Sequence, residues 1–424
     1  MQKCLSLIHF KIIALFTIVY VGLYLIMPSA GFHTDAIVFG TWAQYSFKNG
    51  LGHIYRFGID YLPLYTYVLQ AYAKLQGSDF DIIKNLKYLS AFTLIFDMLA
   101  GYLLFLLVNK YLRNPLKSFG WALFYVLNVM VLYNTLFWGQ VDGMVVAFVF
   151  ASVILAYFGY FSISIVVFVL ALNLKLQAAI FLPIIGMLNL RTLIEKFDYK
   201  KLLYTGFVVL IIELMILYPF FRAGDIGLVK NVIKNSFGKY PFVSYGAFNF
   251  WFLVQDINVY TAAITPDSKE IFGVTMNRWG FLFFCFFSFW ALFHFAKNYF
   301  LNFYSKIKLQ FSLEKTLLSA SLIPLIFFFF NTQMHERYSH PAFLFLVAYA
   351  ILYKDFLPYL IGSLAHFLSL EYIHRYFNLG ANIYDLFFFK TIFIASLYLI
   401  TISYLFFRLF KSKNTPISAY LPKL

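Results

Sequence analysis

Long uncharged apolar stretches recur from one end of this 424-residue chain to the other, and they constrain its fold more than any other feature. Each covers about 16 to 22 residues, close to the ~20 with which a helix crosses the ~30 Å hydrocarbon core of a bilayer. Backbone amides in lipid must be paired internally, so these stretches predict helices. The alternating pattern of a membrane β-barrel is absent. Hydrophobic residues make up 62% of the chain and charged residues 12%, so we predict an all-α polytopic membrane protein.

The basic residues lie between the apolar stretches rather than in one stripe. The formal net charge of +15 is therefore a signal of topology, and nucleic-acid binding is not expected. The predicted spans are residues 10–28, 88–109, 119–137, 202–221, 279–296, 316–333, 339–353, 356–370 and 388–407, with a further apolar region at 143–190. The basic segments 110–117, 191–201, 297–315 and 408–423 then share one face, which the positive-inside rule makes cytoplasmic.

The apolar region 143–190 carries one charged residue, Lys175. It begins outside and ends inside, so it needs an odd number of crossings. Three short helices fit best, with breaks near 157–164 and 173–177, and interrupted segments are where membrane proteins build sites. The total is about twelve spans, with both termini cytoplasmic. The first apolar run resembles a signal peptide, but many equally apolar segments follow it, so a retained span is expected.

Two long segments fall outside the cytoplasm, at residues 28–87 and 222–278, within one transmembrane domain that covers 1–424. In the first, Thr34 or Asp35 suits the N-cap of a short helix that lies in the membrane interface. The second mixes basic and aromatic residues and could cover a site as a lid.

Polar residues gather on the predicted outer side. They are His33, Asp35, Asp60, Trp138, Gln140, Asp142, Lys175, His335, Glu336 and Arg337. A charge near membrane depth costs roughly 2.5 to 3.5 kcal/mol on insertion scales, so their convergence predicts a shared polar cavity. A carboxylate that faces cations is the minimum equipment for transferring a group from a lipid-linked phosphate.

Each of these residues also has a structural interpretation. Asp35 and Asp142 suit helix N-caps, and Asp60 precedes a Tyr-x-Pro turn. Gln140 suits a membrane interface, and Lys175 can reach the interface by snorkelling. Composition and spacing leave these alternatives open.

The polar motifs resemble a known group, the polyprenyl-phosphate-sugar-dependent glycosyltransferases of the GT-C superfamily. Within it they are similar to bacterial mannosyltransferase-like proteins related to the second GPI mannosyltransferase. The matching pieces are Thr34-Asp35 with Phe39 and Trp42, the run from Asp60 to Tyr65, Trp138-Gly139-Gln140-Val141-Asp142, Lys175 with Gln177, and Met334-His335-Glu336-Arg337-Tyr338. Leu62 departs from the pattern, since relatives commonly carry a second proline there.

The resemblance implies an inverting transfer of a hexose, mannose in the family, from a polyprenyl-phosphate donor. Asp35 matches the family's catalytic position and would act as general base at the extracytoplasmic or periplasmic face. The acceptor would be a hydroxyl of a glycan, a lipid or a protein. The implied location is the bilayer of a bacterial inner membrane.

Elementary chemistry assigns roles to the other polar residues. Arg337 can hold a leaving phosphate bidentately, and Lys175 and His335 can add donors. A carboxylate near the anomeric carbon stabilises an oxocarbenium-like transition state. The residues expected to bind the sugar or the acceptor are His33, Asp60, Tyr61, Trp138, Gln140 and Asp142.

No metal or cofactor is predicted. The run from His335 is not HExxH, although a magnesium or manganese site at Asp35 is the lesser alternative, because some GT-C oligosaccharyltransferases use one. Walker and GxGxxG motifs are absent. The competing class is a transporter or flippase of polyprenyl-linked glycans, but transporters usually spread polar residues through the midplane of two similar halves.

Overall fold

A computed structural model describes residues 2–29, 34–236, 238–377 and 390–412 of the chain. The protein divides into two compact units. The first comprises Met1–Leu106, Asn114–Ala179 and Thr192–Lys239, and the second comprises Leu107–Arg113, Ile180–Arg191 and Tyr240–Leu424. The prediction of one transmembrane domain over 1–424 stays a prediction.

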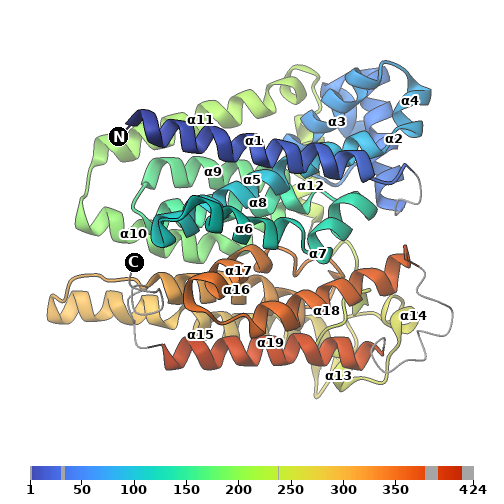
Figure 1. Ribbon diagram of the computed structural model, residues 1–424. Helices are drawn as coiled ribbons and strands as arrows, with labels where there is room; N and C mark the ends of the chain where they lie inside the picture. The colour runs from blue at the N-terminus through green and yellow to red at the C-terminus, as the bar shows by residue number, and fades with distance from the viewer. Residues whose placement is uncertain (1, 30–33, 237, 378–389, 413–424) are drawn as a thin grey trace. The chain divides into compact units, whose positions relative to one another are not determined.

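The first unit is built from helices. In chain order they are α1 (Gln2–Ile26), α2 (Thr34–Asn49), η1 (Leu51–Phe57), α3 (Pro63–Gln76), α4 (Asp79–Lys84), most of α5 (Lys87–Leu112), α6 (Pro115–Val126), α7 (Val129–Leu132), η2 (Tyr133–Phe137), α8 (Asp142–Tyr157), α9 (Phe161–Leu174), the start of η3 (Leu176–Phe181), the end of α10 (Leu182–Glu195), α11 (Tyr199–Arg222) and α12 (Ile226–Asn235). Helix α8 packs on α9, and α2 packs on α3 (Figure 1).

The second unit contains the rest of η3 and α10, followed by helices with short strands between them. These are β1 (Ser244–Tyr245), α13 (Trp251–Val254), α14 (Val259–Ala262), β2 (Glu270–Ile271), β3 (Val274–Thr275), α15 (Met276–Ser305), α16 (Leu313–Phe330), β4 (Met334–His335), α17 (Ala342–Tyr353), α18 (Leu357–His374) and α19 (Thr391–Lys411). Strand β1 pairs with β4 in parallel, and β2 pairs with β3 antiparallel. Helix α16 packs against α15, α17 and α19.

The described part of the chain is mostly helical and holds seven helices long and apolar enough to cross a membrane. They are Leu7–Ile26, Lys87–Leu112, Leu176–Glu195, Tyr199–Arg222, Met276–Ser305, Leu313–Phe330 and Thr391–Lys411. An eighth is added if α6 and the segment Val129–Phe137, which meet at a 53° bend, form one broken span. An all-α membrane protein fits these helices, whereas the predicted twelve spans and their topology stay predictions.

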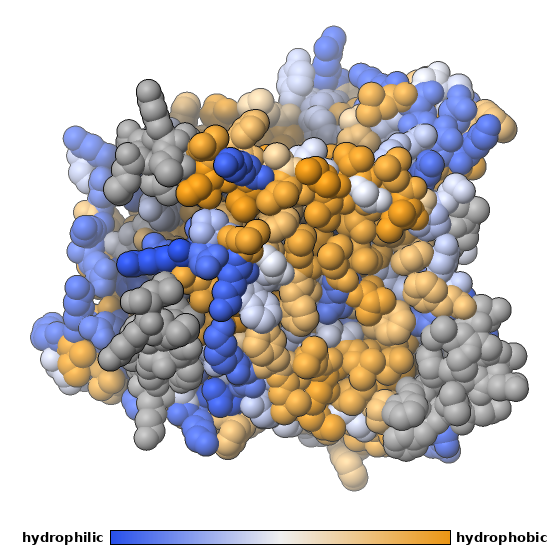
Figure 2. Space-filling view, viewed as in Figure 1, coloured by the Kyte–Doolittle hydropathy of each residue, from blue (hydrophilic) through white to orange (hydrophobic). Residues whose placement is uncertain are grey.

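Apolar side chains cover much of the visible surface of both units (Figure 2). Leu25 on α1 is 74% exposed, Met215 on α11 is 68% exposed, and Phe303 on α15 is 72% exposed. Water would oppose such exposure, whereas contact with lipid tails satisfies it. These helices therefore suit a bilayer.

Two of the three short helices predicted for the region 143–190 are present, with breaks close to the expected positions, whereas the third is the 20-residue apolar helix Leu176–Glu195, which is long enough to cross a membrane. Helix α8 ends at Tyr157, α9 covers Phe161–Leu174, and α10 begins at Leu182. Helices α8 and α9 are 16 and 14 residues long, shorter than a full span. The break between α9 and η3 places Lys175 at a helix end, where its backbone leaves the helical conformation.

Helix α2 is amphipathic in the sense that one face is buried in the protein. Ala36, Phe39, Ala43 and Ser46 follow helical spacing and are all buried. This face lies against α3, to which it is joined through η1. The packing fixes the first turn of α2, which carries Asp35.

Candidate functional site

Asp35 lies in the first turn of α2, where it is partly buried. The helix begins at Thr34, so Asp35 is inside the helix rather than at its N-cap. The positive end of the helix dipole favours a carboxylate in this turn. Two neutral donors reach the same carboxylate oxygen, Oδ2: Trp138 Nε1 at 3.1 Å and Gln140 Nε2 at 2.5 Å.

The turn that carries these two donors depends on Gly139. Its φ is +78°, a left-handed conformation that side-chain-bearing residues rarely adopt. A Cβ atom at Gly139 would also lie 3.0 Å from Ala36 Cβ and 3.3 Å from Ser90 Oγ. The wide helical turn η2 precedes it, with the Trp138 amide donating to the Tyr133 carbonyl at 2.9 Å. Backbone geometry thus brings both Trp138 and Gln140 to Asp35.

Asp142 and Lys175, which also belong to the first unit, form a buried ion pair. Lys175 Nζ donates to Asp142 Oδ1 at 2.6 Å, and the two side chains are 11% and 2% exposed. Asp142 is the first residue of α8 and does not cap it. Lys175 Nζ also lies 5.9 Å from the centroid of the Tyr61 ring. Lys175 is therefore held inside the protein rather than snorkelling.

Tyr65 connects the two carboxylates electrostatically, and sequence reasoning gave it no role. It is fully buried on α3. Burial raises the pKa of the Tyr65 hydroxyl, and the negative charges of Asp35 and Asp142 raise it further. Tyr65 is therefore a neutral hydroxyl close to both acids. Its place in the run from Asp60 to Tyr65 was the available signal.

Aromatic rings surround Tyr61 at the edge of this group. Tyr61 contacts Phe39, Trp42 and Tyr65, with ring centroids 5.2 to 5.7 Å apart. Asp60 forms an ion pair with Lys239, and both side chains are about one-third exposed. Asp60 thus lies nearer solvent than Asp142.

A second buried acid, Asp97, lies behind Asp142. Asp97 lies in the middle of α5 and is 1% exposed. A Cβ atom at Gly143 would overlap Asp97 Oδ1, so the carboxyl group occupies the space that a side chain would need there. The glycine that follows Asp142 is therefore required by packing.

A further carboxylate of the first unit, Asp225, follows α11 and is bound by a guanidinium and an imidazole. Its Oδ2 accepts from Arg56 Nε and His53 Nδ1, each at 2.8 Å. The Arg56 guanidinium lowers the pKa of the Asp225 carboxyl most, burial opposes this, and His53 lowers the pKa further.

The second unit holds the other predicted polar residues. His335 is in β4 and stacks on Tyr245 with ring centroids 5.3 Å apart. Arg337 Nη1 donates to Glu336 Oε1 at 2.6 Å, and both residues are buried. Glu336 is thus the ion-pair partner of Arg337. That Lys175, His335 and Arg337 bind one phosphate stays a prediction.

A buried polar network follows this segment, and the sequence alone did not indicate it. Ser339 Oγ lies 3.0 Å from His366 Nδ1 and 3.0 Å from the Tyr398 hydroxyl. His340 Nδ1 lies 3.1 Å from His366 Nε2. Side chains of α18 and α19 therefore fix the end of the segment that carries His335 and Arg337.

His33 lies outside the described residues. Among the residues that are described, no three His, Cys, Asp or Glu side chains come close enough together to hold a metal ion.

No protein-family model matches the chain, and no curated protein matches it. The fold defines the class, an integral membrane protein built from helices. The particular activity has to be argued from the site itself.

Proposed function

We propose that this protein is an inverting glycosyltransferase that moves a hexose, mannose by its resemblance, from a polyprenyl-phosphate donor to an acceptor hydroxyl. The observation that carries the proposal is the way Asp35 is held. Two neutral donors, from Trp138 and Gln140, bind one oxygen of its carboxylate. Such donors orient a carboxylate without cancelling its charge, which is what a general base needs.

In the proposed reaction, the acceptor hydroxyl gives its proton to the Asp35 carboxylate while its oxygen attacks the anomeric carbon. The bond between that carbon and the phosphate oxygen breaks, and the electron pair leaves with the phosphate. Attack from the opposite side inverts the anomeric carbon. The negative charge of Asp35 also stabilises the oxocarbenium-like transition state.

Lys175, His335 and Arg337 are proposed to bind the leaving phosphate. Lys175 already pairs with Asp142, so an incoming phosphate would share the ammonium with that carboxylate. Arg337 is likewise paired, with Glu336, which fixes the plane of its guanidinium. These pairs preorganise the cations before the donor arrives.

The remaining predicted residues divide by their contacts. Trp138 and Gln140 hold Asp35, and Asp142 holds Lys175. Tyr61 and the more exposed Asp60 are better suited to contact a sugar directly. We further propose that the active site opens on the extracytoplasmic side of a bacterial inner membrane.

The test uses the purified protein in liposomes with radiolabelled polyprenyl-phosphate-mannose. Release of the sugar, or its transfer to an acceptor, supports the glycosyltransferase. Movement of the intact donor across the bilayer without cleavage would instead identify a transporter and contradict the proposal.

A further inference from the structure

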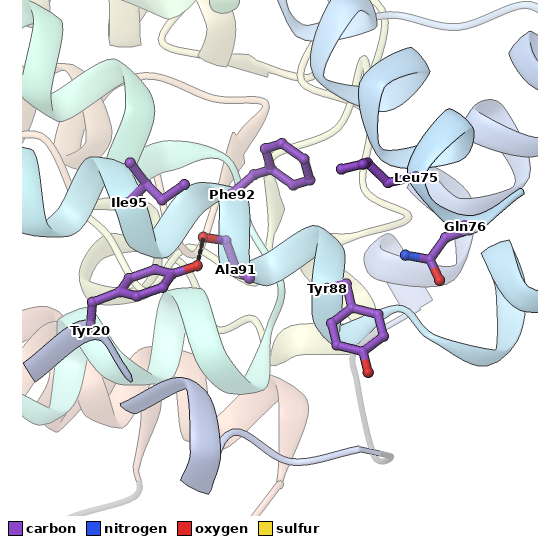
Figure 3. A pocket seen from close by; sticks show the side chains of 7 residues that line it. All are labelled: Tyr20, Leu75, Gln76, Tyr88, Ala91, Phe92 and Ile95. Atoms are coloured by element: carbon purple, nitrogen blue, oxygen red, sulfur yellow. Dashed lines mark hydrogen bonds between the residues drawn. The ribbon is translucent and has the colours of Figure 1, made fainter. Parts of the chain in front are cut away.

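Helix α5 has two different faces. Figure 3 shows one of them, where Phe92 and Ile95 line an apolar groove beside α1 and the end of α3. The opposite face is polar and buried, with Ser90, Thr93 and Asp97 only 2%, 3% and 1% exposed. Steps of three and four residues place these three side chains on one side of the helix. The polar face of α5 is therefore turned into the first unit.

The polar face of α5 meets the segment that joins η2 to α8. A Cβ atom at Gly139 would lie 3.3 Å from Ser90 Oγ, and one at Gly143 would lie 3.2 Å from Thr93 Cγ2. The same Cβ atom at Gly143 would overlap Asp97 Oδ1. Thr93 thus presents its methyl group to Gly143, whereas Asp97 presents its carboxyl group.

The Asp97 carboxyl group is not compensated by the described parts of the chain. Both of its oxygens are buried, and neither has a hydrogen-bond partner there. Asp97 lies about 15 Å from the first residue of α5, along a helix long and apolar enough to span a membrane. The negative charge of Asp142 acts on it as well. An ionised carboxylate in such a place is costly unless a positive charge accompanies it.

Thr135 supplies a second buried oxygen at the same place. It is fully buried in η2, and its hydroxyl faces the Asp97 carboxyl group without reaching hydrogen-bonding geometry. The segment Val129–Phe137, which includes Thr135, meets α6 at a 53° bend. In membrane transporters, oxygen atoms at such helix breaks coordinate Na⁺. The bend therefore brings a possible cation ligand to the buried acid.

The charges and the ligand atoms at Asp97 fit a monovalent cation. Lys175 is bound by Asp142, so Asp97 leaves one negative charge to be balanced. Carboxylate and hydroxyl oxygens are hard ligands, which suit Na⁺ and K⁺ better than zinc or copper. Among the described residues no third His, Cys, Asp or Glu side chain joins the two acids. A single positive charge is what the arrangement requires.

We propose that Asp97 and Thr135 bind one alkali-metal cation, Na⁺ or K⁺, between α5, η2 and the start of α8. The carboxylate supplies the charge and the hydroxyl supplies a further oxygen. The cation balances the buried acid and leaves the ammonium of Lys175 to Asp142. The site is defined by the packing of the first unit, so the inference does not depend on the proposed sugar transfer.

The binding test measures saturable retention of radioactive Na⁺ by the purified full chain in detergent. Asp97→Asn keeps the shape of the side chain without its charge, and Thr135→Val keeps the shape without the hydroxyl. Each should lower the affinity for Na⁺ by about tenfold or more, as loss of groups around a metal site does. Thr93→Val is the matched control, because Thr93 is buried on the same face of α5 and turns its methyl group to Gly143. It should retain Na⁺ like the wild type. No saturable retention by the wild type, or retention unchanged in Asp97→Asn, overturns the proposal.

A second test distinguishes a cation from a proton as the balancing charge. Thermal unfolding of the wild type is compared in the chlorides of Na⁺, K⁺ and N-methylglucamine at equal ionic strength. An ion that binds the folded state should raise the melting temperature by about 2 °C in Na⁺ or K⁺, and Asp97→Asn should not show this rise. Equal melting temperatures of the wild type in all three salts would mean that a proton balances Asp97, which overturns the proposal. If the wild type transfers no sugar but retains Na⁺, the proposed function fails and the cation site stands.

Discussion

Asp35 in the first unit and Arg337 in the second are the charged side chains on which the proposed reaction depends most, and they are held in opposite ways. Asp35 is partly buried and is bound by the neutral donors of Trp138 and Gln140. Arg337 is buried and is bound by a carboxylate, Glu336, at 2.6 Å. The first arrangement keeps a negative charge available, whereas the second cancels a positive charge until an anion competes for it.

These two arrangements distinguish contacts that serve chemistry from contacts that serve structure. A carboxylate bound by cations is a weak base, as the lowered pKa of Asp225 beside Arg56 illustrates. An indole N–H and an amide N–H orient a carboxylate without neutralising its charge. Substitutions at these contacts can distinguish those that affect the reaction rate from those that affect stability.

The largest loss of stability is expected from breaking the buried pair of the first unit. Lys175→Met removes the cation from Asp142, whose side chain is 2% exposed. Removing one partner of a buried ion pair typically costs about 3–5 kcal/mol of unfolding free energy. Thermal unfolding in detergent should show this loss, and the double variant with Asp142→Asn should recover much of it. A single variant as stable as the wild type would show that the pair is not buried as described.

Removing a neutral donor should affect the rate rather than the fold. Trp138→Phe keeps the ring but loses the hydrogen bond to Asp35. Hydrogen bonds to charged groups contribute about 1.5–3 kcal/mol, so transfer should slow by roughly 10- to 100-fold. Steady-state kinetics would measure the change.

The matched control for this change is Trp251→Phe in the second unit, whose indole donates to the Phe330 carbonyl at 3.1 Å. It should lower stability by about 1 kcal/mol and leave the transfer rate per folded protein unchanged. Equal slowing of transfer in both variants would show that the hydrogen bond from Trp138 to Asp35 has no specific effect on the rate.

Glu336→Gln, in the second unit, should lower the free energy of unfolding less than Lys175→Met does. Glu336→Gln keeps an acceptor for Arg337 but removes the negative charge that pairs with it. We expect a loss of about 1–3 kcal/mol in unfolding free energy, measured by thermal unfolding. The isosteric control is Glu314→Gln on α16, a buried acid that accepts a hydrogen bond from the Ser412 hydroxyl at 2.6 Å. A larger loss there would mean that burial, and not pairing with Arg337, sets the effect.

The smallest effect is expected at Asp225, where Arg56 is 52% exposed and solvent screens the pair. Because the folded pKa of Asp225 is lowered, its pairing stabilises the protein above the unfolded value of ~3.9. That contribution is lost as the pH falls below this value towards the folded pKa. The melting temperature of Asp225→Asn should therefore be about 2 °C or less below the wild type at neutral pH. The difference in melting temperature between Asp225→Asn and the wild type should disappear below about pH 4. A difference that grows below pH 4 would contradict the lowered pKa of Asp225.

The helical class and several helix ends could be predicted from the sequence, because apolar length and breaks are local features. The breaks at Tyr157 and beside Lys175 are examples. Apolar length does not say what buries a helix, however. All 12 residues of α17 are buried in the protein, and this helix is too short to count among the seven candidate spans. An apolar stretch gives the same signal whether protein or lipid covers it.

The candidate site was predictable only in part, because its motifs are local in the sequence and the contacts between them are not. The grouping of Asp35 with Trp138 and Gln140 was anticipated because the motifs fell on one predicted side, but their bonds depend on the turn at Gly139. The pairing of Lys175 with Asp142 joins positions on two helices, and only packing reveals it. Tyr65 and His366 carry no signature because a buried tyrosine or histidine is common in apolar sequence.

The role of Asp35 as general base is tested by the transfer rate of Asp35→Asn in the liposome assay, with donor binding and thermal unfolding recorded on the same preparation. The asparagine keeps the shape of the side chain but cannot accept the proton. We expect a rate about 10²- to 10⁴-fold below that of the wild type, with donor binding and melting temperature nearly unchanged. Transfer at the wild-type rate by Asp35→Asn would contradict the assignment of Asp35 as the general base.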